Sequence, residues 1–165
     1  MRTIYMLMHK HKPDADGLAR RVIDSFARVG ISVSAEPWLV QRLGEESGIR
    51  AGMPQACDAI VAVGGDGTLL RANEVAVEHA IPLLGVNVGR VGFLAEVELD
   101  KLDEACKCLA DNRYELDERM MLKAETDGKT MLALNDVVVS RGGYSRLIGI
   151  NAWVDGDQIG RFIAV

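Results

Sequence analysis

Asp66 is the residue whose type and setting most directly suggest chemistry, because glycines enclose its carboxylate in the run Gly64-Gly65-Asp66-Gly67-Thr68. An apolar stretch, residues 60–63, leads into this run, and an amphipathic stretch that begins at Leu69 follows it. This pattern predicts a buried strand, a tight turn and a helix with Thr68 as its N-cap. Asp66 is therefore expected at the carboxyl end of a strand, where open α/β sheets bind ligands.

A carboxylate in a glycine loop restricts what the loop can bind. Glycine loops before helices usually suit phosphates, but Asp66 would repel a phosphate unless a metal ion lay between them. A hydroxyl group is the other suitable target. The loop is not a dinucleotide fingerprint, since Leu70 replaces the third glycine, and no Gly-Lys-Ser/Thr of a Walker loop follows it. The structural alternative is a turn in which Asp66 only caps backbone amides.

A second glycine-rich segment, residues 85–94, follows another apolar run. It contains three glycines and Asn87 within eight residues, which implies backbone geometries that side chains would obstruct. Two such loops at one sheet edge would form a cleft lined with main-chain amides, although two independent tight turns are the alternative. Phe93 in this segment suits either a core position or a platform for a base.

Three further polar features have both a functional and a structural interpretation. Asn135 and Asp136 interrupt an apolar stretch, and they form either a ligand-facing pair or a satisfied strand break. Arg146 flanks a later turn, where it could meet a phosphate. The segment His9-Lys10-His11-Lys12 follows the first expected strand on the ligand edge, as either a phosphate contact or a solvated loop.

The order of the elements predicts the fold class. Strands at 3–8, 31–35, 60–63 and 81–86 alternate with helices at 14–29 and 68–79, which predicts an open parallel Rossmann-like α/β lobe over residues 1–98. Residues 41–56 are expected to form a loop. A helix at 99–110 then opens a second lobe, 99–165, which is mainly antiparallel β. Its expected strands form a meander at 120–125, 130–140, 147–154 and 158–165.

Composition excludes several classes of protein. The chain has 165 residues, 48% of them hydrophobic, and a net charge of −5, which argues against a nucleic-acid surface. We expect no membrane partner, because no apolar run is long enough to span a bilayer. The three cysteines are an odd number and no secretory leader precedes them, which indicates reduced thiols in the cytoplasm. No metal site is expected at the cysteines or at His9 and His11.

Together, the motifs resemble the NAD kinase family. The family's G-G-D-G-T loop is similar to Gly64-Gly65-Asp66-Gly67-Thr68. Diacylglycerol-type lipid kinases have the same loop, and phosphofructokinases have it with serine in the last position. Residues 85–94 resemble its G-x-N-x-G-x-x-G-F-L stretch, and residues 134–136 resemble its asparagine–acid pair. The three motifs occur in the family's order over nearly the whole chain.

The resemblance implies an enzyme that transfers a phosphoryl group from ATP, or from polyphosphate in some members, to the 2′-hydroxyl of the adenosine ribose of NAD, making NADP. Mg²⁺ or another divalent cation would accompany ATP. Asp66 would polarise or deprotonate the hydroxyl, Asn135 and Asp136 would bind the nicotinamide side, and Phe93 would lie against adenine. Further implied nucleotide contacts are Gly65, Gly67, Thr68, Arg71, Asn87 and Arg146. Family members are soluble homo-oligomers, which implies a dimer or tetramer with its sites between the lobes.

The chain departs from the family at its C-terminal end. The family pattern continues with A-D-G and then P-T-G-S-T-A-Y, whereas this sequence stops at Ile163-Ala164-Val165. We therefore expect a truncated β lobe without its later strands, whose open edges need partners. Two rival hypotheses accompany the NAD kinase: a lipid or sugar kinase with the same loop, and a non-catalytic nucleotide-binding or dimerising fragment.

Overall fold

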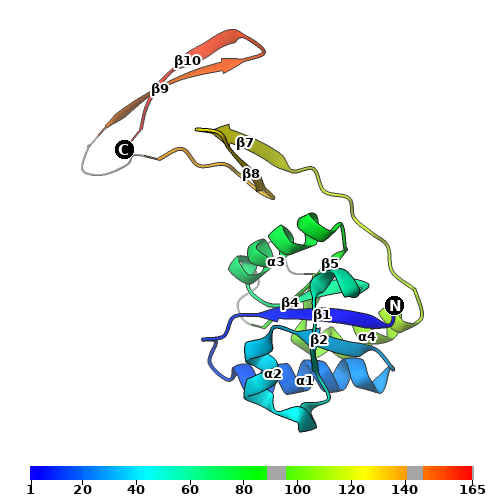
Figure 1. The fold of residues 1–165 in the computed structure, drawn as a ribbon. Coiled ribbons are helices and arrows are strands. Elements are labelled where there is room, and N and C mark those ends of the chain that lie inside the picture. The colour runs from blue at the N-terminus through cyan, green and yellow to red at the C-terminus, as the bar shows by residue number, and fades with distance from the viewer. Residues whose placement is uncertain (89–95, 141–146, 165) are drawn as a thin grey trace. The chain divides into compact units, whose positions relative to one another are not determined.

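The chain forms two compact units, Met1–Arg119 and Met120–Val165, in a computed structural model that describes residues 1–88, 96–140 and 147–164 (Figure 1). Each unit is described by itself below, as unit 1 and unit 2. The predicted fold class is confirmed, because a parallel α/β sheet precedes a set of antiparallel strands.

Unit 1 is built on a parallel sheet, which within the described residues has six strands in the order β3-β2-β1-β4-β5-β6. The strands are β1 (Thr3–Met8), β2 (Ser32–Ala35), β3 (Arg50–Ala51), β4 (Ala59–Gly64), β5 (Leu83–Asn87) and β6 (Val97–Glu98). All six residues of β4 are buried, as expected for a central parallel strand that helices cover on both faces. The carboxyl ends of these strands share one edge of the sheet.

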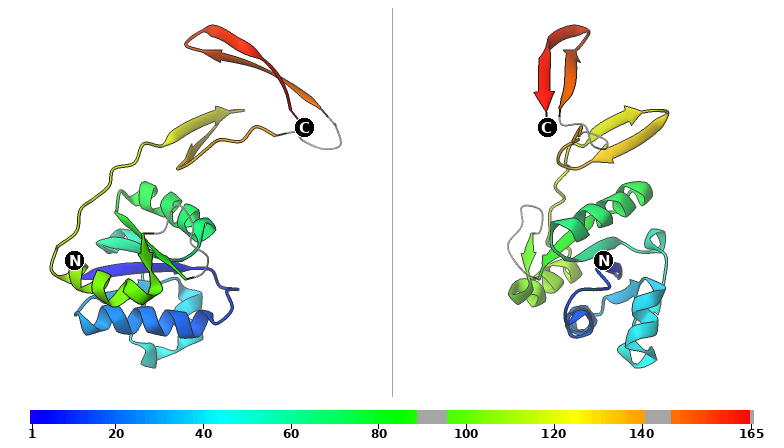
Figure 2. Two further views of the ribbon diagram at one scale, coloured as in Figure 1. Left: turned by 180° about the vertical axis from the view of Figure 1, so that it is seen from behind. Right: turned by 90° about the vertical axis from the view of Figure 1, so that its left-hand side faces the viewer.

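Helices cover the two faces unequally (Figure 2). They are α1 (Ala15–Arg28), α2 (Pro37–Leu43), α3 (Asp66–His79) and α4 (Leu102–Ala110). Side chains of α1, α2 and α4 share one apolar core with alternate residues of the strands, including Met6 and Val61. On the opposite face α3 buries Leu69, Ala72 and Ala76 (Figure 1). Each face of the sheet is thus packed against helices.

Two expectations for unit 1 need correction. The stretch 41–56, expected to be a loop, contains the end of α2, the edge strand β3 and two 3₁₀ turns, Glu45–Ser47 and Pro54–Ala56. The expected lobe boundary after residue 98 also differs from the structure, whose units divide after Arg119. The reason is that α4 buries Leu102, Cys106 and Leu109 in the core of unit 1.

Unit 2 consists of two antiparallel hairpins, β7 (Leu122–Thr126) with β8 (Lys129–Ala133), and β9 (Ile148–Val154) with β10 (Asp157–Ala164). The hairpins turn at Asp127-Gly128 and Asp155-Gly156, where all four residues have positive φ, as a type I′ turn requires. The two hairpins form separate two-stranded sheets, not the expected continuous meander. The expected strand 130–140 ends at Ala133, because Asn135 lies in a bend directly after β8.

Among the described residues, no helix combines the length and the apolar character that crossing a membrane requires.

Candidate functional site

The turn between β4 and α3 is the centre of the candidate site. Gly65 is the N-cap of α3 with φ −103° and ψ −170°, and Asp66 is the first helical residue. The sequence predicted Thr68 as the N-cap, but Thr68 is the third residue of the helix. The helix therefore starts earlier, and Asp66 gains a favourable position for a carboxylate, since the N-terminal end of a helix carries partial positive charge.

The glycines of this turn have two different roles. A Cβ built on Gly64 would lie 2.2 Å from Thr68 Oγ1 and 2.6 Å from Thr68 Cβ, so glycine lets Thr68 fold back on the strand end. A Cβ on Gly65 or Gly67 would meet no described atom within 4 Å, and neither residue has a positive φ. Neither packing nor backbone geometry within the described chain therefore requires glycine at these two positions, which leaves the backbone there open to close approach.

Asn87 lies beside this turn at the same sheet edge. It is the last residue of β5, only 6% exposed, and it pairs in register with Gly64 of β4. Its neighbour on the other side is Glu98 of β6. The structure thus brings the two glycine-rich segments together at one edge, as the sequence predicted, at least as far as the second segment is described.

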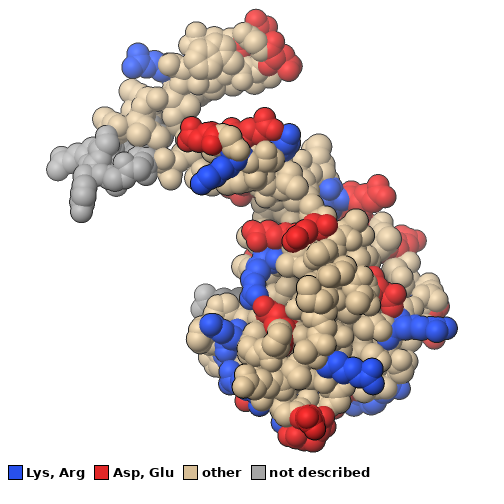
Figure 3. All heavy atoms as spheres, in the orientation of Figure 1, with Lys and Arg blue, Asp and Glu red and all other residues tan. Residues whose placement is uncertain are grey.

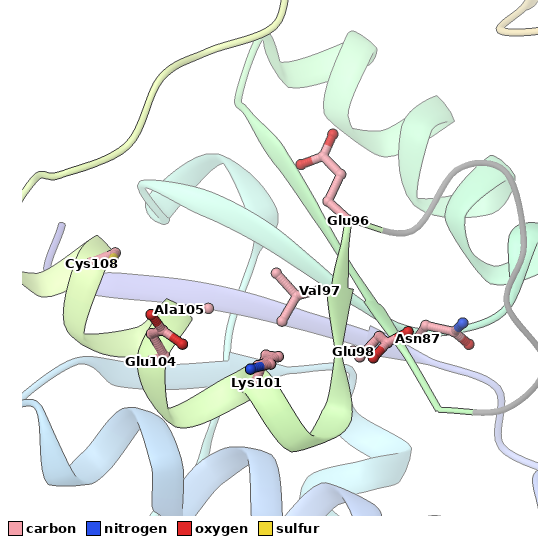
Figure 4. Close-up of a pocket in the computed structure, with 8 residues that line it drawn as sticks. All are labelled: Asn87, Glu96, Val97, Glu98, Lys101, Glu104, Ala105 and Cys108. Carbon is pink, nitrogen blue, oxygen red and sulfur yellow. The ribbon is translucent and has the colours of Figure 1, made fainter.

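Asn87 also lines an open pocket of about 470 Å³ between the sheet edge and α4 (Figure 4). The other lining residues are Glu96, Val97, Glu98, Lys101, Glu104, Ala105 and Cys108. Three carboxylates and one ammonium group line it, and one of the carboxylates, Glu96, is paired with Arg119 at 2.9 Å, so the lining is mildly acidic. Such a lining is unfavourable for phosphates. It suits hydroxyl or amide groups, because these can donate hydrogen bonds to the carboxylates.

Arg71, which the resemblance implied as a nucleotide contact, forms an ion pair within the protein. Its guanidinium forms an ion pair with Glu36, which immediately precedes α2, and Trp38 Nε1 donates a hydrogen bond of 3.0 Å to the other oxygen of Glu36. Tyr5 lies close by on β1, where burial raises the pKa of its hydroxyl and the charge of Glu36 raises it further. Sequence reasoning missed Glu36, although a carboxylate directly after a short strand at the ligand edge was a visible indication.

The remaining predicted site residues are not joined to Asp66 by the described structure. Asn135 and Asp136 are exposed and belong to unit 2, directly after β8. Phe93 and Arg146 lie outside the described residues. A search of the described residues finds no group of three or more His, Cys, Asp or Glu side chains that could hold a metal ion.

Comparison with known proteins identifies the family. Residues 6–114 match the family model of the ATP-NAD kinase N-terminal domain. The chain belongs to the NAD kinase family. Among curated relatives, NAD kinase 2 of Streptomyces coelicolor is 35% identical over 98% of this chain, and the NAD kinase of Heliobacterium modesticaldum is 39% identical over 96%. The chain spans 58% of the length of each of these NAD kinases.

Solved structures agree with this membership at the level of the fold. Yeast NADH kinase complexed with NADH matches 98% of this chain and 55% of its own, with a TM-score of 0.77 at 17% sequence identity. An NAD kinase from Archaeoglobus fulgidus in complex with ATP matches 99% of this chain and 57% of its own, with a TM-score of 0.71 at 25% identity.

Proposed function

We propose that this chain carries the nucleotide-binding core of an NAD kinase, which transfers the γ-phosphoryl group of ATP to the 2′-hydroxyl of the adenosine ribose of NAD. The observation that carries the proposal is the turn at Asp66, where a carboxylate at the start of α3 stands between two glycines with open space above them. Membership of the family argues against the lipid or sugar kinase that shares this loop.

Asp66 would act on the hydroxyl group that attacks the phosphorus. A carboxylate is far less basic than a sugar hydroxyl, so it does not remove the proton before the reaction. It accepts a hydrogen bond from the hydroxyl, orients the oxygen, and takes the proton late, as the phosphoryl group arrives. Most of the acceleration then comes from holding the hydroxyl and the γ-phosphate in line.

Mg²⁺ is proposed to arrive with ATP. This ion usually keeps several waters and is held by one or two carboxylates together with substrate phosphates, so a single carboxylate such as Asp66 fits that demand. Bound there, it would neutralise charge on the transferring group. Between the phosphates and Asp66, the ion would also reduce the repulsion between their negative charges.

The other predicted contacts belong to the same proposal. Asn87 lies at the described edge beside Gly64, where it can bind a nucleotide together with Gly65, Gly67 and Thr68. Asn135 and Asp136 would hold the nicotinamide side of NAD, and Arg71, Phe93 and Arg146 would contact the nucleotide. A cytoplasmic location and a homo-oligomer, dimer or tetramer, complete the proposal.

The test is NADP formation by the purified chain with ATP, NAD and Mg²⁺. We expect Asp66→Asn to lower turnover by about 10²–10⁴, the range for loss of a general acid–base group, with no loss of folding. Asp24→Asn, which removes an exposed carboxylate on α1, is the matched control. Near-normal turnover in Asp66→Asn would refute the role of Asp66. NAD binding without NADP formation by the unmodified chain would instead identify a binding core that needs further chain for catalysis.

A further inference from the structure

An ion pair links the helix that begins at Asp66 to an element on the other face of the sheet. Arg71 lies in the second turn of α3, and its guanidinium contacts the carboxylate of Glu36, which stands between β2 and α2. α3 covers one face of the sheet, whereas α2 belongs to the helices that cover the opposite face (Figure 1). The pair therefore connects two elements that the sheet keeps apart, at the edge where its parallel strands end.

Both oxygens of the Glu36 carboxylate have partners. One oxygen accepts from Arg71, and the other accepts a hydrogen bond of 3.0 Å from Trp38 Nε1. The Glu36 side chain is only 22% exposed, so its charge is partly withdrawn from water and needs a partner nearby. Burial raises the pKa of the Tyr5 hydroxyl on β1, Glu36 raises it further and Arg71 lowers it, so Tyr5 lies close to both charges. The pair thus has a defined position over β1.

Packing by itself holds the start of α3 less firmly than the other helices are held. The buried residues of α3 are one leucine and two alanines, Leu69, Ala72 and Ala76. Alanines bury little apolar surface, and little burial gives little stabilisation. Within the described chain, the acidic residues further along the helix, Glu74 and Glu78, form no ion pair. Gly67 lies four residues before Arg71 and thus one turn away on the same side of the helix. A contact that fixes Arg71 therefore also fixes the turn that carries Asp66.

The surroundings make this a specific contact between two charges. Acidic and basic side chains are interspersed on the face of unit 1 that Figure 3 shows, so no extended field of one sign acts there. Exposed ion pairs contribute little to stability, but a partly buried carboxylate that loses its partner keeps the cost of its burial. The Arg71 side chain is 51% exposed, so it has room to rearrange. Loss of the Glu36 charge should therefore release Arg71 without unfolding unit 1.

We infer that Glu36 is a positioning residue for the transfer reaction, because it holds Arg71 and thereby the first turns of α3, which carry Asp66. The inference rests on the proposed function, in which Asp66 acts on the attacking hydroxyl group. Glu36 acts through Arg71 and needs no contact with the reacting atoms. A guanidinium has five N–H donors, so pairing with Glu36 leaves donors for a nucleotide. Displacement of a reacting group by about 1 Å lowers turnover by up to about a hundredfold, so a small shift of this turn matters.

The experiment is a double-mutant cycle with Glu36→Gln, Arg71→Gln and the two combined, in the full chain. Each variant is measured for NADP formation and for hydrogen exchange of the backbone amides of residues 68–72. Glu36→Gln keeps the shape of the side chain and an acceptor for Trp38 but loses the charge. It should lower kcat about tenfold or more, leave KM for NAD nearly unchanged, and speed the exchange of these amides. The split between kcat and KM is expected because Asp66 contributes to the chemical step.

The matched control is Asp103→Asn. It breaks the ion pair of 2.6 Å between Asp103 on α4 and Arg28 on α1, and it changes the net charge by the same amount as Glu36→Gln. Because this pair joins two helices on the face opposite α3, the control should keep kcat and the exchange of residues 68–72. An equal loss of kcat in the control would overturn the inference, since general destabilisation would then explain the effect.

The cycle decides whether Glu36 acts through Arg71. A combined variant no worse than the poorer single variant supports the inference, because residues that depend on each other have effects that do not add. Additive losses overturn it, since Arg71 would then act independently of Glu36. Normal kcat or unchanged exchange in Glu36→Gln also overturns it. If the unmodified chain forms no NADP, that result bears on the proposed function alone, and the exchange measurements still decide whether Glu36 fixes the turn through Arg71.

Discussion

Gly64 at the end of β4 and Gly67 at the start of α3 should respond in opposite ways to the same substitution. Gly64→Ala places a methyl group where Thr68 already lies, 2.2 Å from its Oγ1 and 2.6 Å from its Cβ. The Cβ of Thr68 is bonded to the backbone, so rotation of the side chain does not remove the overlap. Gly67→Ala places the same methyl group in open space, on a residue that is already helical.

The expected changes in stability follow from these surroundings. Forcing a methyl group into an occupied position typically costs about 1–3 kcal/mol, so Gly64→Ala should lower Tm by roughly 4–10 °C for a unit of this size. Alanine at a compatible helical position stabilises a protein by about 0.4–1 kcal/mol, because the unfolded chain loses freedom. Gly67→Ala should therefore keep or slightly raise the Tm, while NAD binding weakens about tenfold or more if a ligand occupies the space.

Thermal denaturation followed by circular dichroism, together with NAD titration, measures both effects on the same samples. Each variant is the control for the other, since both add one methyl group to one turn. An unchanged Tm for Gly64→Ala would show that Thr68 does not pack against the strand end. Unweakened NAD binding by a stable Gly67→Ala variant would show that the open space above the turn does not belong to the ligand.

Two further predictions concern stability and reactivity. The amides of Arg2 and Thr3 donate to Asp58 Oδ2 at 2.6 and 2.9 Å and lower the pKa of its carboxyl group below 3.8. Its stabilisation is therefore present above the ordinary pKa of 3.8 and is lost as pH falls through the lower folded pKa. Urea denaturation should find Asp58→Asn about 0.5–1 kcal/mol less stable than the unmodified chain at pH 7, and this difference should shrink as the pH falls below 3.8. Cys106 is fully buried, and burial raises the pKa of its thiol to about 12. In native protein at pH 8, a thiol reagent should modify the partly exposed Cys108 long before Cys106, and equal rates would contradict the packing of α4.

The sequence predicted well those elements whose type depends on residues close together in the chain. Continuous apolar runs that end at glycines predicted β4 and β5, and the helical spacing of apolar residues predicted α1. Because parallel strands end at one edge, the adjacency of Asp66 and Asn87 also followed from the order of the elements. The hairpin turns at Asp127 and Asp155 were predicted for the same reason, since the turn type depends on two adjacent residues.

The features that sequence reasoning missed depend on contacts between distant residues. Arg71 meets Glu36 only because β2 lies next to β1 on the side of the sheet away from β5, which no local pattern reveals. The assignment of α4 to unit 1 likewise depends on packing against α1 and the sheet, not on the change of pattern near residue 98. The N-cap is Gly65, three residues before the expected Thr68, because the backbone is already helical at Asp66, which the apolar pattern that begins at Leu69 does not reveal.

The order of the strands in unit 1 has a consequence for how the chain folds as it leaves the ribosome. β1 is synthesised first and lies inside the sheet, with β2 and then β3 added on one side and β4, β5 and β6 on the other. Every new strand thus joins an edge that already exists, and none has to insert between two earlier strands. Domains generally begin to fold at the N-terminal end during synthesis. The sheet that positions Asp66 can therefore grow outward from β1 in step with translation, first on the side of β2 and then on the side of β4.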